Sequence, residues 1–239
     1  MKWTITTQHK DFFESHSFIA FEEFLSKEQV ELAADLVKEF LCNHFHIPKD
    51  TFFTLTPEDV FLASRDLSRN MPILRKIICN KQLGSIAAEL MLKKHVRLGF
   101  DQIISTTQLP YQGKNEFFSK LLNKEHRLPE ISSIQGILGG ALILLSENTP
   151  SFFEEEQELF SSKSLFPKRP GDIVFFNQYF PLSFNLFYGQ KEALYLLVTF
   201  TETNAVYIHN EKDPHTHALK SIGYVFGDRF QEKYHPTLA

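Results

Sequence analysis

Apolar residues at helical spacing dominate the first ninety residues. After Ser26 they form a stripe that predicts an amphipathic helix running to about residue 45, made of Val30, Ala33, Ala34, Val37, Phe40 and Leu41. Ser26 and Gln29 fit a capping box, in which each side chain satisfies a free backbone N–H of the first turn. A short strand is expected at residues 17–21. Further helices are expected after Thr56-Pro57, from Asn70 and from Asn80.

From residue 95 the apolar period changes from helical to two. Alternation over residues 96–104 predicts a strand with Val96, Leu98, Phe100, Gln102 and Ile104 on one face. Further strands are expected at residues 134–145, 173–176 and 193–200, with a short last one at 206–209. The glycines at 136, 139 and 140 indicate a bulge or a close approach of backbones. Residues 115–122 predict one or two helical turns, and residues 146–168 a polar loop.

The order of elements, helices first and strands after, predicts an α+β fold with a mainly antiparallel sheet. The segment from Arg169 to Asn204 organises this prediction, because the Pro170-Gly171-Asp172 turn opens one buried strand and residues 193–200 form another. A chain of 239 residues that is 43% hydrophobic can bury one sizeable core. We therefore expect a single domain over residues 1–239.

Charge and cysteine content narrow the function classes. The net charge of -4, without a block of Lys or Arg, disfavours nucleic acid as a partner. Two cysteines without a C-x-x-C motif support neither a disulfide framework nor a cysteine zinc site, which fits the reducing cytoplasm. No apolar run approaches the roughly 20 residues of a membrane helix. Nucleophile-elbow, P-loop and G-x-G-x-x-G motifs are absent from the sequence.

Two motifs in the right order resemble one enzyme family. Residues 17–30, SFIAFEEFLSKEQV, resemble the strand and Leu-Ser-x-Glu-x helix start of phytanoyl-CoA-dioxygenase-like proteins. Residues 169–176, RPGDIVFF, resemble the Gly-Asp-x-x-Phe-Phe strand that precedes the last metal ligand of that family. The resemblance implies the double-stranded β-helix (jelly-roll) fold of the Fe(II)/2-oxoglutarate-dependent oxygenases. Residues 1–94 would be a mainly helical flank, 95–210 the jelly-roll core and 211–239 a C-terminal extension packed on the barrel.

The resemblance also implies a set of iron ligands that the sequence lacks. Such enzymes hold Fe(II) with two histidines and a carboxylate, leaving positions open for 2-oxoglutarate and O2. In the family these ligands are an H-x-D/E at the barrel entry and a histidine after the Gly-Asp strand, and a basic residue pairs with 2-oxoglutarate. Here residues 98–113 contain no H-x-D/E, and Leu182-Ser183 stands where the last histidine is expected. Lys191 is the single basic residue near the position expected for the arginine that pairs with 2-oxoglutarate.

We therefore expect a catalytically degenerate jelly-roll protein that uses neither Fe(II) nor 2-oxoglutarate and acts by binding a small polar ligand or a protein partner. Its candidate pocket comprises Gln102, Gln108, Asn177, Tyr179, Asn185 and Lys191. Two alternatives stay open. One is an active non-haem iron oxygenase with displaced ligands, and the other is a divalent-cation-dependent transcriptional regulator, which the acidic pI of about 6.2 disfavours.

The displaced site has one dense candidate cluster. If residues 213–217 are extended, alternation places Asp213, His215 and His217 on one side, within reach of one metal ion. Against this, Asp213-Pro214 is a turn signal, and exposed loop histidines usually bind nothing. His44 and His46 are more simply explained as imidazoles near the negative end of a helix dipole.

Overall fold

The computed structural model describes residues 4–107, 113–114, 116–148, 166–184 and 192–239. Its helices are α1 (Thr7–His16), α2 (Lys27–Phe45), α3 (Pro57–Ala63), α4 (Pro72–Ile78), α5 (Lys81–Leu90) and α6 (Glu116–Leu122). Short 3₁₀ helices are η1 (Lys49–Thr54), η2 (Leu67–Arg69), η3 (Leu128–Glu130) and η6 (Ala218–Ile222). The strands are β1 (Phe18–Phe21), β2 (Arg97–Ser105), β3 (Ile134–Asn148), β4 (Ile173–Asn177) and β5 (Glu192–Tyr207).

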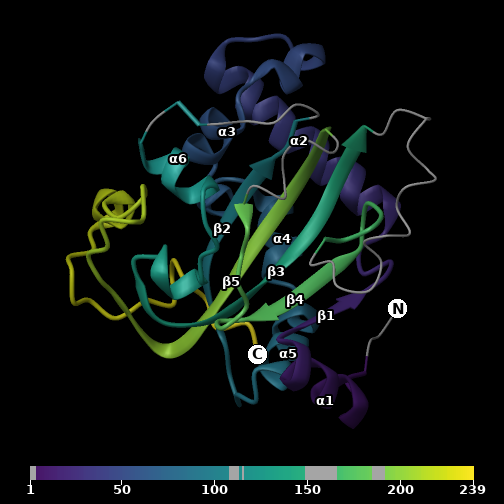
Figure 1. Cartoon of the computed structure of the whole chain (residues 1–239), viewed down its shortest axis with the longest axis vertical. Helices are drawn as coiled ribbons and strands as arrows, with labels where there is room; N and C mark the ends of the chain where they lie inside the picture. Colours follow the sequence, from purple (N-terminus) through teal and green to yellow (C-terminus); the bar gives the residue numbers. More distant parts are fainter. Residues whose placement is uncertain (1–3, 108–112, 115, 149–165, 185–191) are drawn as a thin grey trace.

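The five strands form one antiparallel sheet in the order β1-β4-β3-β5-β2. The N-terminal helices pack on one face of this sheet, behind the strands in Figure 1. The C-terminal residues and α6 lie toward the opposite face and the β2 edge. This combination of helices with an antiparallel sheet confirms the expected α+β class.

Both faces of the central strands are buried, which explains their almost wholly apolar sequences. On β5, Leu194, Leu196 and Val198 face the N-terminal helices, while Tyr195 and Leu197 enter the second core on the other face. The strands β3 and β4 alternate in the same way. The sheet is therefore the middle layer of the fold, between two apolar cores.

Most predicted elements are present. The capping boxes and Pro signals mark the true starts of α2 and α3: the Ser26 side chain accepts from the backbone N–H of Gln29, and Thr56 caps α3. The helix expected from Asn70 begins at Pro72, and the one expected from Asn80 begins at Lys81. The helix α1 is not predicted by the apolar pattern, because it buries Phe13 alone.

Two strand predictions are wrong in detail. The short strand expected at residues 206–209 is instead the end of β5, which continues through a polar stretch because register shifts in β3 keep the two strands paired. The single face expected for residues 96–104 is also incorrect. Leu98 lies in the first core and Phe100 in the second, because the register of β2 against β5 shifts between Leu98 and Asp101.

The hydroxyl of Thr199 forms hydrogen bonds with the backbone of β2 where the register of that strand shifts. Its Oγ1 accepts from the backbone N–H of Phe100 at 2.8 Å and donates to the Phe100 carbonyl at 3.0 Å. A side chain at Gly99 would collide with it, since a Cβ there would lie 2.5 Å from Thr199 Oγ1. Thr199 therefore replaces ladder hydrogen bonds that the shifted strand cannot make.

Replacing Thr199 with valine should destabilise the protein by about 1–3 kcal/mol, because both backbone groups of Phe100 lose their partner inside the sheet. Chemical unfolding of T199V and T199S measures the effect. The serine variant keeps the hydroxyl but lacks the methyl group. We expect it to lose less stability than T199V. Equal losses in the two variants would contradict the assigned role of the hydroxyl.

Candidate functional site

The position expected for the last iron-binding histidine, Leu182-Ser183, lies among apolar residues. Leu182 and Phe184 are 3% and 2% exposed and belong to the second core. The ring of Phe184 packs edge-on against Phe61, with centroids 6.2 Å apart. The face of the sheet nearest to them carries further apolar side chains, among them Phe100, Leu142, Val174, Phe176 and Leu197. These described residues offer a metal ion no donor atoms.

All ten histidines lie within the described residues, so their positions can be compared with the family requirement. His126 is the one that the fold brings beside Leu182. Its backbone exchanges two hydrogen bonds with Leu182, at 2.9 and 2.7 Å, in an antiparallel bridge that directs both side chains to the same side. Because these two residues lie 56 positions apart, no local sequence pattern predicts that they pair.

The imidazole of His126 is engaged in a hydrogen bond within the protein. The side chain is buried, and its Nε2 lies 3.3 Å from the carbonyl oxygen of Lys120. A carbonyl accepts and does not donate, so Nε2 carries the proton in this contact and is not a metal ligand. Within the described ranges, no three His, Cys, Asp or Glu side chains come close enough to hold a metal ion together.

Gln102 is fully engaged within the protein. Its Nε2 lies 2.8 Å from the Phe61 carbonyl, 2.9 Å from Ser64 Oγ and 3.0 Å from the Ile103 carbonyl. Its Oε1 accepts from Arg65 Nε at 2.8 Å. A buried amide with this many partners holds β2 to the segment after α3, and it has little capacity left for a ligand.

The other described members of the predicted pocket lie elsewhere. Asn177 ends β4, and its Oδ1 accepts from the backbone N–H of Tyr179 at 2.9 Å. Two strands, β3 and β5, separate β4 from the strand that carries Gln102. Tyr179 is 63% exposed. The structure therefore does not bring Gln102 together with Asn177 and Tyr179, and Gln108, Asn185 and Lys191 lie outside the described residues.

The Asp213-His215-His217 cluster does not adopt the predicted geometry. Residues 213–217 form turns rather than an extended segment. The Asp213 carboxylate accepts from the backbone N–H groups of Ser133 and His215, at 2.8 and 2.9 Å, and lies 3.6 Å from Arg65. His217 turns instead toward His209, with ring centroids 5.8 Å apart. The Asp-Pro turn signal thus prevails over the alternation.

His215 stays neutral in this environment. Burial, aided by the positive charge of Arg65, lowers its pKa to about 3, against the opposing influence of Asp213. No described residue satisfies its buried Nε2.

A buried charged cluster, formed by Arg65, Asp66, Arg69, Asp101 and Asp213, joins η2, β2 and the C-terminal residues. Arg65 lies 3.8 Å above the ring of Phe100, and Arg69 pairs with Asp66 at 3.0 Å. The carboxylate of Asp101 accepts from the backbone N–H and the hydroxyl of Ser68. Two guanidinium groups thus face three carboxyl groups.

This imbalance perturbs the acidic members of the cluster. Burial, with the nearby Asp66 carboxylate, raises the pKa of Asp101 to about 7, although the Ser68 hydrogen bonds oppose the rise. Burial also raises the pKa of Asp66. Perturbed groups of this kind occur at functional sites, but here every member is packed between protein elements, and the adjoining cavity measures about 20 Å³. A cavity of that size holds about one water molecule.

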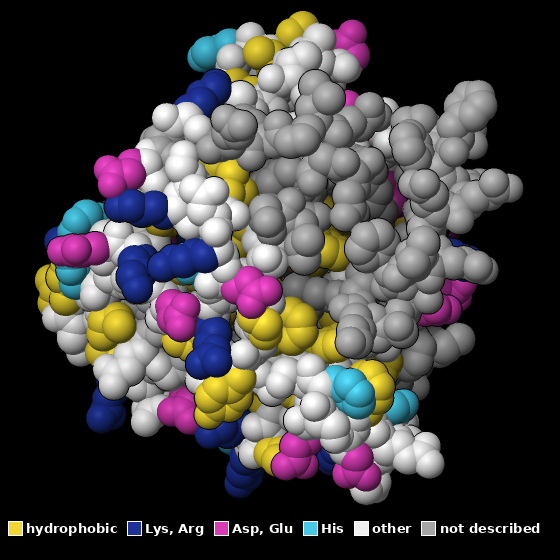
Figure 2. All heavy atoms as spheres, viewed as in Figure 1, with side chains coloured by type: hydrophobic (Ala, Val, Ile, Leu, Met, Phe, Trp, Pro, Cys, Tyr) yellow, Lys and Arg dark blue, Asp and Glu magenta, His cyan; other side chains and the backbone are white. Residues whose placement is uncertain are grey.

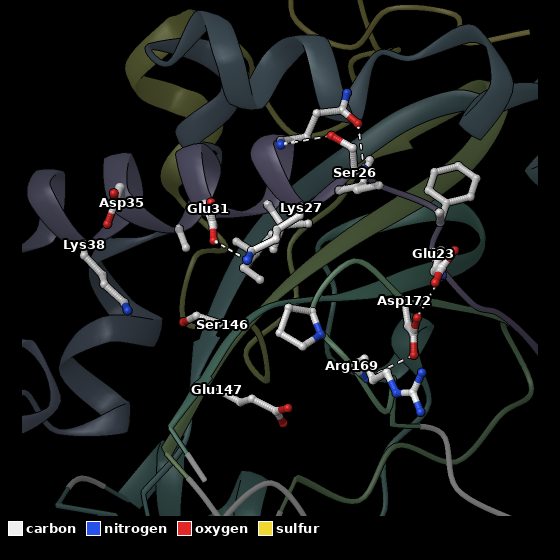
Figure 3. A pocket seen from close by; sticks show the side chains of 17 residues that line it. Glu23, Ser26, Lys27, Glu31, Asp35, Lys38, Ser146, Glu147, Arg169 and Asp172 are labelled. Atoms are coloured by element: carbon white, nitrogen blue, oxygen red, sulfur yellow. Dashed lines mark hydrogen bonds and ion pairs between the residues drawn. The ribbon is translucent and has the colours of Figure 1, made fainter. Parts of the chain in front are cut away.

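A larger hollow of about 960 Å³ lies between α2 and the ends of β3 and β4. Figure 3 shows Lys38 from α2, Glu147 from β3 and Arg169 from the turn before β4 around it. Burial lowers the pKa of Lys38, whose ammonium lies 5.3 Å from the Phe53 ring centroid. The buried Oγ of Ser146, also on the wall, has no hydrogen-bond partner among the described residues. This hollow can accept a small molecule that carries charges of both signs.

The comparisons with known proteins concern the fold. No protein-family model matches the chain, and no curated protein matches it. Among solved structures, the non-haem α-ketoglutarate-dependent carbocyclase SnoK from nogalamycin biosynthesis is 12% identical, with a TM-score of 0.64 over 98% of this chain and 97% of its own. The corresponding epimerase SnoN is also 12% identical, with a TM-score of 0.63 over 96% of both chains.

CT296 from Chlamydia trachomatis is 16% identical and matches 84% of this chain and 99% of its own, with a TM-score of 0.46. None of the described helices is long and apolar enough to cross a membrane. The matches to SnoK and SnoN agree with the resemblance of residues 17–30 and 169–176, and with the order of helices and strands. The chain therefore has the jelly-roll fold of the Fe(II)/2-oxoglutarate-dependent oxygenases.

Proposed function

We propose that this protein keeps the oxygenase fold without the iron-dependent reaction and acts by binding. One observation supports the proposal: Leu182-Ser183 stands where the resemblance places the last iron-binding histidine, and Leu182 is buried there. Two histidines provide most of the affinity of such a site for Fe(II), and their loss removes it.

The histidines and carboxylates that the structure describes near this position do not suit Fe(II) and 2-oxoglutarate. His126 is near the expected position, but its Nε2 donates to a backbone carbonyl. His215 reaches the second core through its contact with Phe61, with ring centroids 6.0 Å apart, and its carboxylate neighbour Asp213 is held by Arg65. Asp213 would have to leave Arg65 unpaired in order to bind a cation. We therefore assign no catalytic step to these side chains.

The hollow between α2 and β3 supports the binding role. Its wall combines the cations Lys38 and Arg169 with the carboxylates of Glu31, Asp35 and Glu147. A lining that carries charges of both signs suits a small polar molecule better than an apolar one. We propose this hollow as the ligand site in place of the pocket predicted around Gln102.

The face shown in Figure 2 gives the transcriptional-regulator alternative little support. On the face shown in Figure 2, the described Lys and Arg side chains are interspersed with Asp and Glu. Binding to the phosphate backbone of DNA relies on clustered positive charge. We therefore favour a small molecule or a protein as the partner.

The absence of turnover is tested by incubating the protein with Fe(II), ascorbate, 2-oxoglutarate and O2 and measuring succinate by mass spectrometry. The expected result is no succinate above a control that lacks protein. Succinate that forms in the wild type and is lost in H126A, or in a variant combining H215A and H217A, would contradict the proposal. The same loss would identify the displaced ligands.

A further inference from the structure

Buried polar atoms without a hydrogen-bond partner gather just before β3. They are the hydroxyls of Ser132 and Ser133 and the Nε2 atom of His215, and no described residue bonds to them. The carboxylate of Asp213 links two of these residues, because it accepts from the backbone N–H groups of Ser133 and His215 at 2.8 and 2.9 Å. A buried polar atom that bonds to nothing costs free energy, and native proteins rarely contain one. A ligand that bonds to these atoms would remove that cost.

Ser133 and His215 line the same cavity, whereas Ser132 does not. The cavity is the one beside the buried charged cluster, and its volume is about 20 Å³. A site needs roughly 10–15 Å³ of such volume to hold a water molecule. The cavity therefore has room for one water molecule and is too small for an organic ligand.

Hydrogen bonds on both sides hold the two cavity residues in place. Ile208 donates its backbone N–H to the Ser133 carbonyl at 3.0 Å. On the other side, the backbone N–H of Asn210 donates to Thr216 Oγ1 at 3.0 Å, next to His215 in the chain. The backbone positions of Ser133 and His215 are thus set by the protein itself, and the walls of the cavity do not depend on a ligand.

The charges on the wall favour a neutral ligand. Arg65 and Asp213 both line the cavity, and their side chains approach to 3.6 Å. A cation would lie close to the Arg65 guanidinium, and an anion would lie close to the Asp213 carboxylate. A molecule that can both donate and accept is able to bond to the Ser133 hydroxyl and to the His215 imidazole in either tautomer. Water meets these requirements of size, charge and hydrogen bonding.

We propose that this cavity binds one water molecule, which bridges Ser133 Oγ and His215 Nε2. A bridging water is nearly as favourable in enthalpy as a direct hydrogen bond. The water fastens the turn at His215 to the residues that lead into β3, and it completes the hydrogen bonds of a neutral imidazole. The proposal goes beyond the proposed function, because the cavity is separate from the hollow between α2 and β3 and the water binds whatever that hollow holds.

Replacing each serine with alanine tests the bridge in solution. S133A removes a hydroxyl that bonds to the water, so its unfolding equilibrium constant, measured by urea titration, should rise about fivefold. S132A is the matched control, because it removes a buried hydroxyl from the neighbouring residue, which does not line the cavity. Removing an unpartnered hydroxyl should leave the constant unchanged or lower it. A constant for S133A no higher than that for S132A would overturn the proposal.

A high-resolution crystal structure of the full-length wild type tests the occupancy of the cavity without depending on a variant. The expected result is one peak of electron density within hydrogen-bond distance of both Ser133 Oγ and His215 Nε2. Crystals grown with rubidium in place of sodium and potassium distinguish water from a bound cation, because rubidium gives an anomalous signal. An anomalous peak in the cavity, or a cavity without density, would show that no water bridges the two side chains.

Discussion

Replacing Arg65 with methionine is expected to destabilise the protein by about 3–5 kcal/mol, because the change leaves a buried carboxylate without its partner. The Arg65 side chain is 9% exposed and that of Asp213 is 2% exposed, so water compensates little for the lost charge. The same change removes the donor to Gln102 and the cation above Phe100. Chemical denaturation measures the loss.

A double-mutant cycle separates the charge from the packing. Removing the orphaned carboxylate in R65M with D213N should recover part of the stability lost in R65M alone. R65K keeps the charge without the forked geometry and should lie between the wild type and R65M. A loss below about 1 kcal/mol in R65M would show that Arg65 does not hold the C-terminal residues to the body of the protein.

Replacing Asp101 with asparagine should make the protein more stable at pH 8 than the wild type, by roughly 2–4 kcal/mol. The pKa of Asp101 in the folded protein is about 7, whereas the unfolded chain releases this proton near pH 4. The folded state therefore holds the extra proton between these values. Stability from this group is complete below about pH 4 and is lost as the pH rises to about 7.

Urea unfolding from pH 4 to pH 8 checks this prediction. The D101N variant is neutral throughout, so the fall in stability attributed to Asp101 should disappear, while the two proteins should have similar stability near pH 4. D11N, at an exposed position of α1, provides a control for the loss of one negative charge. A D101N variant less stable than the wild type at pH 8 would contradict the buried-charge account.

His235 opposes Asp101 in the same pH window. Burial, with the nearby Arg69, lowers the pKa of His235 to about 3, although bonds to the Gly99 and Leu98 carbonyls oppose the shift. The unfolded chain takes up this proton near pH 6.5, so stability from His235 is present above that pH and is lost as the pH falls toward 3. Once the Asp101 contribution is removed, acid destabilisation should therefore be steeper in D101N.

Local signals in the sequence predict much of the fold. The Ser26 and Thr56 caps, the Pro170-Gly171 turn and the apolar runs at 173–176 and 193–200 depend on neighbours within a few residues. The irregularity in β2 could not be found in this way, because Thr199 fills it from a strand one hundred residues later. The helix α1 could not be predicted, because a short helix that buries one side chain has almost no apolar stripe.

The predicted pocket could not be derived from local signals, because its residues make long-range contacts. Gln102 is a polar residue in an apolar strand, and such a residue is either a ligand contact or a satisfied buried group. Its partners Arg65 and Ser64 lie about forty residues earlier, and their spacing gives no sign of the contact. The bridge that brings His126 beside Leu182 is equally non-local. Contacts between residues that are distant in the sequence can be identified from the folded structure and not from local sequence patterns.

We propose that the protein keeps the oxygenase fold without an iron-dependent reaction. The sharpest test is an anaerobic titration of the full-length protein with Fe(II) and 2-oxoglutarate, followed by calorimetry and by visible absorption. We expect no micromolar binding of Fe(II) and no absorption band from a metal-bound 2-oxoglutarate. Micromolar binding of both, at one equivalent each, would show that the protein retains a working iron site.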